Sequence, residues 1–393
     1  MTHVAQVVIG AAYGDEGKGR VVDWLATLAP GAVTVVRSNG GAQAGHTVTL
    51  ADGTRHVFHH IGSGALAGAS THLSQFMISH PMLFREELDQ VAAKSGCVHV
   101  TADPRGAVTT PWDMMINQAL ESSRGEERHG SCGMGFGETA GRTEDTAYTL
   151  TVADLRAPRL RDKLRAIQGD WLPARMKQLG LKFGNDSPLS HAASSDIVKR
   201  FVDDCLFFSS VVDLREDATL SADQTVIFEA AQGLRLDQHY PDFPYLTRSN
   251  TGVANIAAIA REASLETIDA FYVSRCYLTR HGRGPMSDER NIAPFFAVDD
   301  PTNQPNPWQE TLRFGLLDPA ALASDIHADM TCASGLTLRP AIAVTCLDQC
   351  IGARVAWIRD GKTVDGSRDE FLADIRAATH LTQLQTFAGP TNR

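Results

Sequence analysis

The sequence predicts an α/β protein: one large domain, residues 1–393, with a mainly parallel central β-sheet and helices on both of its faces. Short, strongly apolar runs recur along the chain, as in strands that are buried on both sides. Several of these runs end in glycine-rich or polar turns, and segments of helical periodicity lie between them. We therefore expect the turns to meet at the carboxyl edge of the sheet, where α/β proteins bind ligands.

Composition and charge restrict the class of protein. The chain is 43% hydrophobic and 21% charged, and no apolar run is long enough to span a bilayer. Its formal charge of −10 argues against a surface that coats nucleic acid. The N-terminus begins with an apolar strand and lacks a signal-peptide pattern, so we expect a cytoplasmic protein without a membrane partner. Seven scattered cysteines without a Cys-x-x-Cys pair predict free, buried thiols rather than a zinc site.

The first glycine-rich turn lies between a predicted strand, residues 4–12, and a helical pattern formed by Val21, Val22, Trp24, Leu25 and Leu28. It reads Gly-Asp-Glu-Gly-Lys-Gly over residues 14–19. Strand, turn and helix in this order place N–H groups and a lysine where phosphate is stabilised, as in a P-loop-NTPase-like fold. The spacing differs from the standard P-loop, because two carboxylates lie inside the turn. They would repel a phosphate unless a metal bridges the two or the acid takes part in the chemistry.

A second strand, predicted at residues 32–36, leads into a polar segment that contains Gln43, Gly45 and His46. An ordinary turn with a solvent-facing histidine is the alternative, but two glycine-rich strand ends so near in sequence can open on one crevice. Residues 48–58 alternate around Asp52-Gly53, which predicts a hairpin. For the nearby histidines 56, 59 and 60 we favour a structural role over metal binding.

Three later segments have the composition of ligand-binding loops. Residues 124–142 are rich in glycine and predict a mobile loop, with a flexible linker as the alternative. A strand at 226–228 ends in a polar turn at Gln232, and hydroxyl residues at 247–251 precede a helix at 253–263, which suits either a phosphate or a helix cap. A strand at 341–344 leads to Asp348, a carboxylate that could read guanine.

Taken together, these motifs resemble those of the adenylosuccinate synthetase family. The resemblance rests on their order and spacing: residues 14–19, Ala-Gly-His-Thr at 44–47, Glu-Ala-Ala-Gln-Gly at 229–233, Thr-Arg-Ser-Asn-Thr at 247–251, Arg-His-Gly-Arg-Gly-Pro at 280–285 and Gly-Pro at 389–390. It spans nearly the whole chain. It implies a ligase that joins C6 of a purine nucleotide to the amino group of L-aspartate, consuming a nucleoside triphosphate with Mg²⁺.

The resemblance also assigns catalytic roles. Asp15 would take the proton from N1 of the purine and ligate Mg²⁺, with the carbonyl of Gly45 completing the metal shell. Loss of that proton places negative charge on O6, which can then attack the γ-phosphorus. His46 would act as the acid and as a hydrogen-bond donor to the phosphate oxygens, and Gln232 would hold the purine edge.

The binding residues follow from the same resemblance. Nucleotide and phosphate contacts are expected from Gly14, Glu16, Gly17, Lys18, Gly19, Gln43, Ser131, Cys132, Thr247, Asp348, Gly389 and Pro390. Thr311 and Arg313 would bind the aspartate. The family also implies a homodimer, and Arg142 is the candidate by position for an arginine that crosses the dimer interface.

Departures from the family pattern leave alternatives open. Arg313 alone remains of a run of arginines, so another arginine must help to bind aspartate, or the chain is a non-catalytic nucleotide-binding regulator. Cys346 stands in place of a lysine beside Asp348, which leaves ATP or dATP open beside GTP as the donor. Several features resemble a phage branch that acts on dGMP. Asp15 is retained, which favours IMP, with dGMP or GMP as the alternative substrates.

Overall fold

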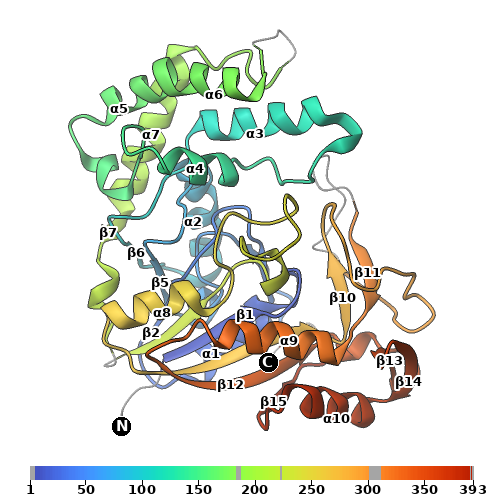
Figure 1. The fold of residues 1–393 in the computed structure, drawn as a ribbon. Coiled ribbons are helices and arrows are strands. Elements are labelled where there is room, and N and C mark those ends of the chain that lie inside the picture. The colour runs from blue at the N-terminus through green and yellow to red at the C-terminus, as the bar shows by residue number, and fades with distance from the viewer. Residues whose placement is uncertain (1–4, 183–186, 222–223, 301–310, 390, 392–393) are drawn as a thin grey trace.

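The computed structural model describes residues 5–182, 187–221, 224–300, 311–389 and 391. Its centre is a nine-stranded sheet in which every neighbouring pair is parallel (Figure 1). In spatial order the strands are β15 (Leu384–Thr386), β12 (Thr337–Thr345), β9 (Thr267–Arg275), β1 (Ala5–Gly10), β8 (Thr225–Glu229), β2 (Val33–Arg37), β5 (Ser70–Leu73), β6 (Val100–Ala102) and β7 (Val212–Leu214). The predicted α/β class is confirmed.

Helices cover both faces of the sheet, as the central strand β1 shows. Val7 and Ile9 pack in the same apolar cluster as α8 (Val253–Glu262) and α9 (Pro319–Met330). Val8, between them, packs with α1 (Lys18–Leu28). Successive side chains of a strand point to opposite faces, so α1 lies across the sheet from α8 and α9. The predicted face of α1 is correct except at its last residue, Leu28, which is 65% exposed where the helix ends.

A second group of helices gathers at the β5–β7 end of the sheet, at the top of Figure 1. It consists of α2 (Pro81–Ser95), α3 (Pro111–Arg124), α4 (Phe136–Thr143), α5 (Leu160–Ala166), α6 (Leu172–Leu179) and α7 (Ser195–Val211). The expectation of a loop throughout 124–142 is wrong, because α4 begins at Phe136. Its buried face, Phe136, Thr139 and Arg142, packs on neighbouring elements, and these contacts outweigh the poor helix propensity of glycine.

In the described part of the chain, three two-stranded antiparallel sheets accompany the central sheet. The predicted hairpin around residues 52–53 is confirmed as β3 (His46–Thr49) and β4 (Arg55–Phe58). The others are β10 (Tyr277–Arg280) with β11 (Arg313–Leu316), and β13 (Arg354–Arg359) with β14 (Lys362–Ser367), which precedes α10 (Arg368–Thr379). β10 and β11 join segments more than thirty positions apart in the chain, which local pattern does not reveal.

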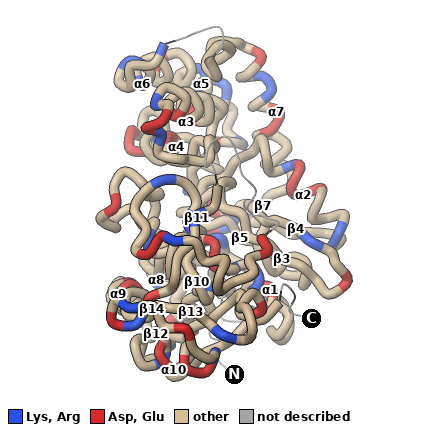
Figure 2. Tube along the Cα trace, turned by 90° about the vertical axis from the view of Figure 1, so that its right-hand side faces the viewer, with Lys and Arg blue, Asp and Glu red and all other residues tan. Residues whose placement is uncertain are grey.

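The placement of charged residues and cysteines agrees in part with the expectations drawn from the sequence. Figure 2 shows Lys and Arg interspersed with Asp and Glu over most elements. Within the described ranges, no helix combines the length and apolar character needed to cross a bilayer. All seven cysteines are free, as expected, but only Cys205, Cys276 and Cys350 are buried, whereas Cys97 and Cys332 are exposed.

Candidate active site

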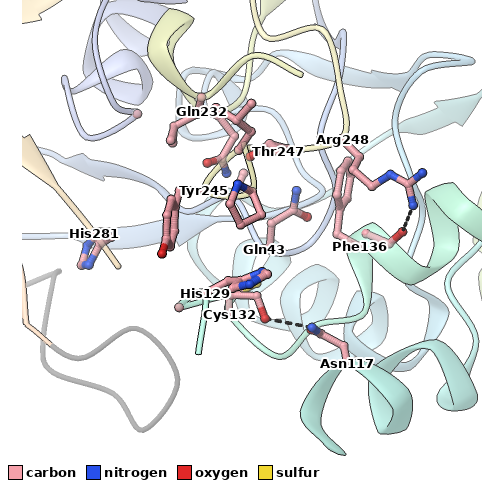
Figure 3. A pocket seen from close by; sticks show the side chains of 18 of the residues that line it. Gln43, Asn117, His129, Cys132, Phe136, Gln232, Tyr245, Thr247, Arg248 and His281 are labelled. Atoms are coloured by element: carbon pink, nitrogen blue, oxygen red, sulfur yellow. Dashed lines mark hydrogen bonds between the residues drawn. The ribbon is translucent and has the colours of Figure 1, made fainter. Parts of the chain in front are cut away.

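A cavity of about 920 Å³ opens where the loops after β1, β2 and β8 meet (Figure 3). Its lining includes these predicted site residues: Gly14, Asp15, Gln43, Gly45, His46, Ser131, Cys132, Gln232 and Thr247. The adjacent parallel strands bring residues from distant parts of the chain to one edge of the sheet. The expectation that Asp15 and His46 share one crevice is therefore met.

Close backbone packing fixes the three loops against one another. The side chain of Asn39, after β2, donates to the carbonyl of Ala231 (3.0 Å) and accepts from its N–H (2.7 Å). Gly233, after β8, lies so close to the first loop that a Cβ there would stand 2.4 Å from the carbonyl oxygen of Ala12. Only glycine fits at this contact, and Asn39 is a supporting residue that sequence reasoning missed.

Asp15 faces the cavity with a partly exposed carboxylate. Its Oδ2 lies 3.8 Å from Nε2 of His281, and its main-chain carbonyl accepts a hydrogen bond from Nε of Arg275. Burial raises the pKa of Asp15, and the positive charges of His281 and Arg275 oppose that shift. A raised pKa makes a carboxylate a stronger base toward a purine N–H.

Glu16 and Lys18 have a different place from the one expected. The Glu16 carboxylate accepts from the N–H groups of Ala12 (3.1 Å) and Gly14 (2.6 Å), and Lys18 Nζ contacts Glu16 Oε2 (3.1 Å) and the carbonyl of Gly14 (2.7 Å). Both side chains are buried and neither lines the cavity. The pair braces the turn from within, because the loop N–H groups and the ammonium satisfy one another there. In this structure the two side chains support the loop, and their contact with phosphate stays a prediction.

The start of α1 retains the character of an anion site. Gly17 precedes the helix with a left-handed φ of 89°, and no side chain caps the first turn. Its first N–H groups, including that of Gly19, are therefore available to an anion. Neither Gly17 nor Gly19 lines the cavity described above.

His46 is held by a buried ionic cluster. Its Nδ1 lies 2.6 Å from Oε1 of Glu229 and 2.7 Å from Nη1 of Arg37, which itself pairs with Glu229 Oε2 (3.1 Å). Burial would raise the pKa of Glu229, but His46 and Arg37 hold it well below its usual range. Because an ionised carboxylate only accepts, we assign the Nδ1 hydrogen to the bond with Glu229.

This assignment directs the other imidazole nitrogen to a ligand. Nε2 of His46 is buried and has no partner among the described residues, while the ring lines the cavity. Burial lowers the pKa of His46 to about 4, with Glu229 opposing the shift, so the imidazole is neutral at physiological pH. Sequence reasoning missed Glu229 as a site residue, although it opens the Glu-Ala-Ala-Gln-Gly motif.

The glycine-rich loop at 129–135 forms the opposite wall. The ring of His129 packs edge-on against Tyr245 at 5.7 Å, and Gly130 touches the backbone of Gly282. This loop therefore reaches the segments that carry Thr247 and the β10 turn. Burial raises the pKa of Cys132 to about 11, so its thiol is neutral and a poor nucleophile.

Asp348 and Gly389 lie together outside this cavity. Arg20 of α1 donates to the carbonyls of Ala388 (3.3 Å), Gly389 and Thr391 (2.8 Å). Burial lowers the pKa of Arg20, and the charge of Asp348 opposes that shift. The structure thus gathers α1, the turn after β12 and the segment after β15. Pro390, also predicted here, lies outside the described residues.

The predicted aspartate-binding residues do not reach the cavity. Arg313 donates to the carbonyls of Gly282 (3.1 Å) and Gly284 (2.8 Å) and pairs with Glu289 (2.6 Å). In this structure the guanidinium of Arg313 supports the 282–284 turn, and its contact with aspartate stays a prediction. Thr311 is exposed and adjoins residues 301–310, which are outside the described ranges.

Other arginines line the cavity, and a further one is buried in an ion pair. Arg280 and Arg283 belong to the lining, and Arg280 stacks over the ring of Tyr13 at 4.7 Å. Arg142 is fully buried and pairs with Asp113 at 2.9 Å, so its expected role across a dimer interface is wrong. A buried guanidinium that is bound within its own subunit cannot also extend to a neighbour.

Two oxygen ligands in the cavity lining could hold Mg²⁺. Among the described residues, no group of three His, Cys, Asp or Glu side chains could hold a metal by itself. Magnesium, however, is commonly bound by one or two carboxylates together with substrate phosphates. The carboxylate of Asp15 and the carbonyl of Gly45 both belong to the cavity lining and could supply such a partial shell.

Comparison with known proteins identifies the family. The family model described as adenylosuccinate synthetase matches residues 7–311. The adenylosuccinate synthetase of Anaeromyxobacter dehalogenans (strain 2CP-C) is 31% identical over 393 residues, covering 94% of this chain and 83% of that protein. That of Trichodesmium erythraeum (strain IMS101) is 32% identical over 287 residues, covering 72% of this chain and 63% of that one.

Two solved structures share the fold. The fully ligated adenylosuccinate synthetase of Plasmodium falciparum superposes with a TM-score of 0.70 at 17% identity, covering 100% of this chain and 98% of its own. The succinoaminodeoxyadenylate synthetase of cyanophage S-2L, bound to dGMP and dATP, gives 0.61 at 16% identity, covering 100% and 94%. With the family match over residues 7–311 and the identity along nearly the whole length, the chain belongs to the adenylosuccinate synthetase family and is a ligase of that family.

Proposed function

We propose that this ligase joins L-aspartate to C6 of IMP, with hydrolysis of a nucleoside triphosphate, and forms adenylosuccinate through a 6-phosphoryl intermediate. One observation carries the proposal: a carboxylate of raised pKa and an imidazole with an unpartnered nitrogen line the same cavity at the sheet edge. The neighbouring glycine-rich loops and hydroxyl groups suit the phosphates of a nucleotide.

The reaction proceeds in two displacements. Asp15 takes the proton from N1, and the electron pair moves to O6, which bonds to the γ-phosphorus as the bond to the leaving diphosphate breaks. The aspartate amine then attacks C6, and phosphate departs with the former O6. The products are adenylosuccinate, nucleoside diphosphate and phosphate. Gln232, three positions after β8 ends, lines the cavity and would hold the purine edge.

His46 supports the transferring phosphoryl group. Its imidazole is neutral at physiological pH, with Nδ1 bonded to Glu229. The negative charge of a bound triphosphate favours protonation of Nε2, which then donates to a phosphate oxygen. Glu229 and Arg37 act through this ring by fixing its orientation.

Two further groups of residues complete the proposed site. Asp15 and Gly45 would hold Mg²⁺, which when bound neutralises phosphate charge. Arg283 lines the cavity and carries a planar guanidinium group that suits a carboxylate of aspartate. We further propose a cytoplasmic homodimer, as the family resemblance implies.

The donor is proposed to bind at Asp348, Gly389 and Arg20, with GTP, ATP or dATP as candidates. The main alternative is the same reaction on dGMP or GMP with ATP or dATP, giving 2-amino-(deoxy)adenylosuccinate. Cys346 beside Asp348 favours it, because a thiol in place of a lysine alters the environment of the predicted guanine-reading carboxylate. The shared fold with a cyanophage enzyme bound to dGMP and dATP is compatible with it.

A matrix assay tests both proposals. The protein is offered IMP, GMP and dGMP, each with GTP, ATP or dATP, Mg²⁺ and aspartate, and phosphate release and product mass are measured. We expect aspartate-dependent turnover with IMP. Turnover confined to dGMP or GMP would establish the alternative. No aspartate-dependent phosphate release in any combination, with nucleotide binding retained in calorimetry, would instead indicate a regulator.

A further inference from the structure

One face of α3 holds the glycine-rich loop that forms a wall of the cavity. The contacts are Asn117 with Ser131 Oγ (2.8 Å) and the N–H of Gly135 (3.2 Å), Gln118 with the carbonyl of Gly133 (3.1 Å), and Glu121 with the N–H groups of Gly130 (2.9 Å) and Ser131 (3.3 Å). Figure 3 shows Asn117 reaching from α3 toward this loop. Three side chains within two helical turns therefore set the conformation of the loop.

The orientation of the Asn117 amide is decided by its neighbours. The N–H of Gly135 can only donate, so the atom of Asn117 that it meets is the carbonyl oxygen Oδ1. The other atom, 2.8 Å from Ser131 Oγ, is then Nδ2, which can only donate. Ser131 therefore accepts a hydrogen bond from Asn117.

This bond determines what Ser131 can offer a ligand. With an acceptor lone pair engaged by Asn117, the hydroxyl hydrogen must find its acceptor elsewhere. In the described part of the chain, the bond from Asn117 is the one that engages this hydroxyl, and Ser131 lines the cavity. Ser131 can therefore donate this hydrogen to an acceptor in the cavity.

The loop has few other donors to give. The N–H groups of Gly130 and Ser131 are taken by Glu121, a nearly fully buried carboxylate that also pairs with Arg124 at 2.6 Å. These N–H groups are thus unavailable to a ligand, and the charge of Glu121 would repel an anion nearby. The guanidinium of Arg124, which pairs with Glu121 and also lines the cavity, offsets that repulsion, and the Ser131 hydroxyl adds a neutral donor to the same wall.

We propose that Asn117 is a positioning residue that makes Ser131 a donor to a phosphate oxygen of the substrate purine monophosphate. The inference rests on the proposed function. It adds a determinant of monophosphate affinity on α3, outside the loops that carry the motifs. Asn117 acts through Ser131 and not through the reacting atoms.

The test replaces Asn117 by aspartate, which has the same shape. Its second oxygen cannot donate, so the Ser131 hydroxyl turns to it and withdraws its hydrogen from the ligand. We expect Asn117→Asp to raise KM for the purine monophosphate by about 10- to 100-fold, the range for a hydrogen bond to a charged group. KM for triphosphate and aspartate, and the melting temperature, should stay unchanged. Ser131→Ala should show the same pattern.

A double mutant separates this mechanism from simple charge repulsion. If Asn117 acts through the hydroxyl, Asn117→Asp combined with Ser131→Ala is no worse than either change alone. Full additivity would mean that the new charge repels phosphate independently, and would overturn the proposal. Ser122→Asp, which adds one charge on an exposed position of the same helix, is the matched control and should leave every KM unchanged.

The remaining outcomes are also decisive. If Asn117→Asp lowers the melting temperature, Ser131→Ala, which leaves Asn117 and its bond to Gly135 in place, decides whether the hydroxyl serves the monophosphate. A KM within twofold of wild type in that variant overturns the inference while the proposed reaction stands. Failure of the wild-type protein to bind any purine monophosphate in calorimetry would overturn both.

Discussion

Replacement of Asp15 by asparagine separates its proposed catalytic role from any structural one. The carboxylate approaches His281 at 3.8 Å, and the bond from Arg275 is to the main chain, which the substitution retains. A partly exposed pair of this kind is worth about 1 kcal/mol or less. Because burial raises the pKa of Asp15, the ionised form is disfavoured in the folded protein, and a neutral amide relieves that cost.

Stability should therefore be nearly unchanged, whereas catalytic activity should fall sharply. An amide cannot take the N1 proton, and loss of a general base typically costs about 10²- to 10⁴-fold, or roughly 3 to 5 kcal/mol in the activation barrier. We therefore expect a variant that melts within about 3 °C of wild type or above it, and that has lost nearly all turnover.

The assay is aspartate-dependent phosphate release, measured beside a thermal melt. Raised Mg²⁺ distinguishes two causes of inactivity: weakened metal binding would be rescued, whereas loss of the base would not. Asp162→Asn is the matched control, since that carboxylate is 74% exposed on α5. Retention of more than about a tenth of wild-type turnover would refute the assignment of Asp15 as the base, because general-base losses begin near a hundredfold.

Three further predictions follow from buried charges and from the cavity lining. Glu229→Gln leaves the buried guanidinium of Arg37 without its counter-charge, so the free energy of unfolding, measured in urea, should fall by about 3 to 5 kcal/mol, and kcat should fall because His46 loses its fixed orientation. Burial raises the pKa of Asp329 from 3.8 to about 6, so the stabilisation from its protonated form is lost as pH rises through 6. Asp329→Asn should lack this loss and gain up to about 3 kcal/mol relative to wild type between about pH 4 and about pH 8, measured by urea unfolding at both values. Arg283→Gln should raise KM for aspartate about tenfold or more with KM for nucleotide unchanged, and equal effects on both in steady-state kinetics would contradict the proposed aspartate contact.

Sequence reasoning succeeded where short-range pattern carries the information. The apolar run before Gly14 and the periodicity after Gly17 predicted β1 and α1, and the residues around Asp52 predicted the β3–β4 hairpin. Residue types at strand ends also predicted that Asp15 and His46 would share a cavity. These inferences depend on neighbours in the chain and on the rule that parallel strands end at one edge.

Sequence reasoning did not predict which partners the charged side chains take in the folded chain. Lys18 was expected to face phosphate and instead meets the Glu16 carboxylate within its own turn. Arg313 was expected to meet aspartate and instead holds the turn after β10. A side chain with several possible acceptors bonds to the one that offers the best distance and angle. Those distances and angles are set only after the loops have packed.

The sequence by itself determined the class of fold and the order of strands and turns near the N-terminus, and it predicted which groups react. Only the tertiary structure decided how those groups are oriented: His46 and Glu229 are 183 positions apart, yet one hydrogen bond between them directs the free nitrogen of the imidazole. Periodicity encodes which face of an element is buried, over a few residues. Hydrogen-bond partners across a sheet depend on the register and packing of the whole chain, which no local pattern contains.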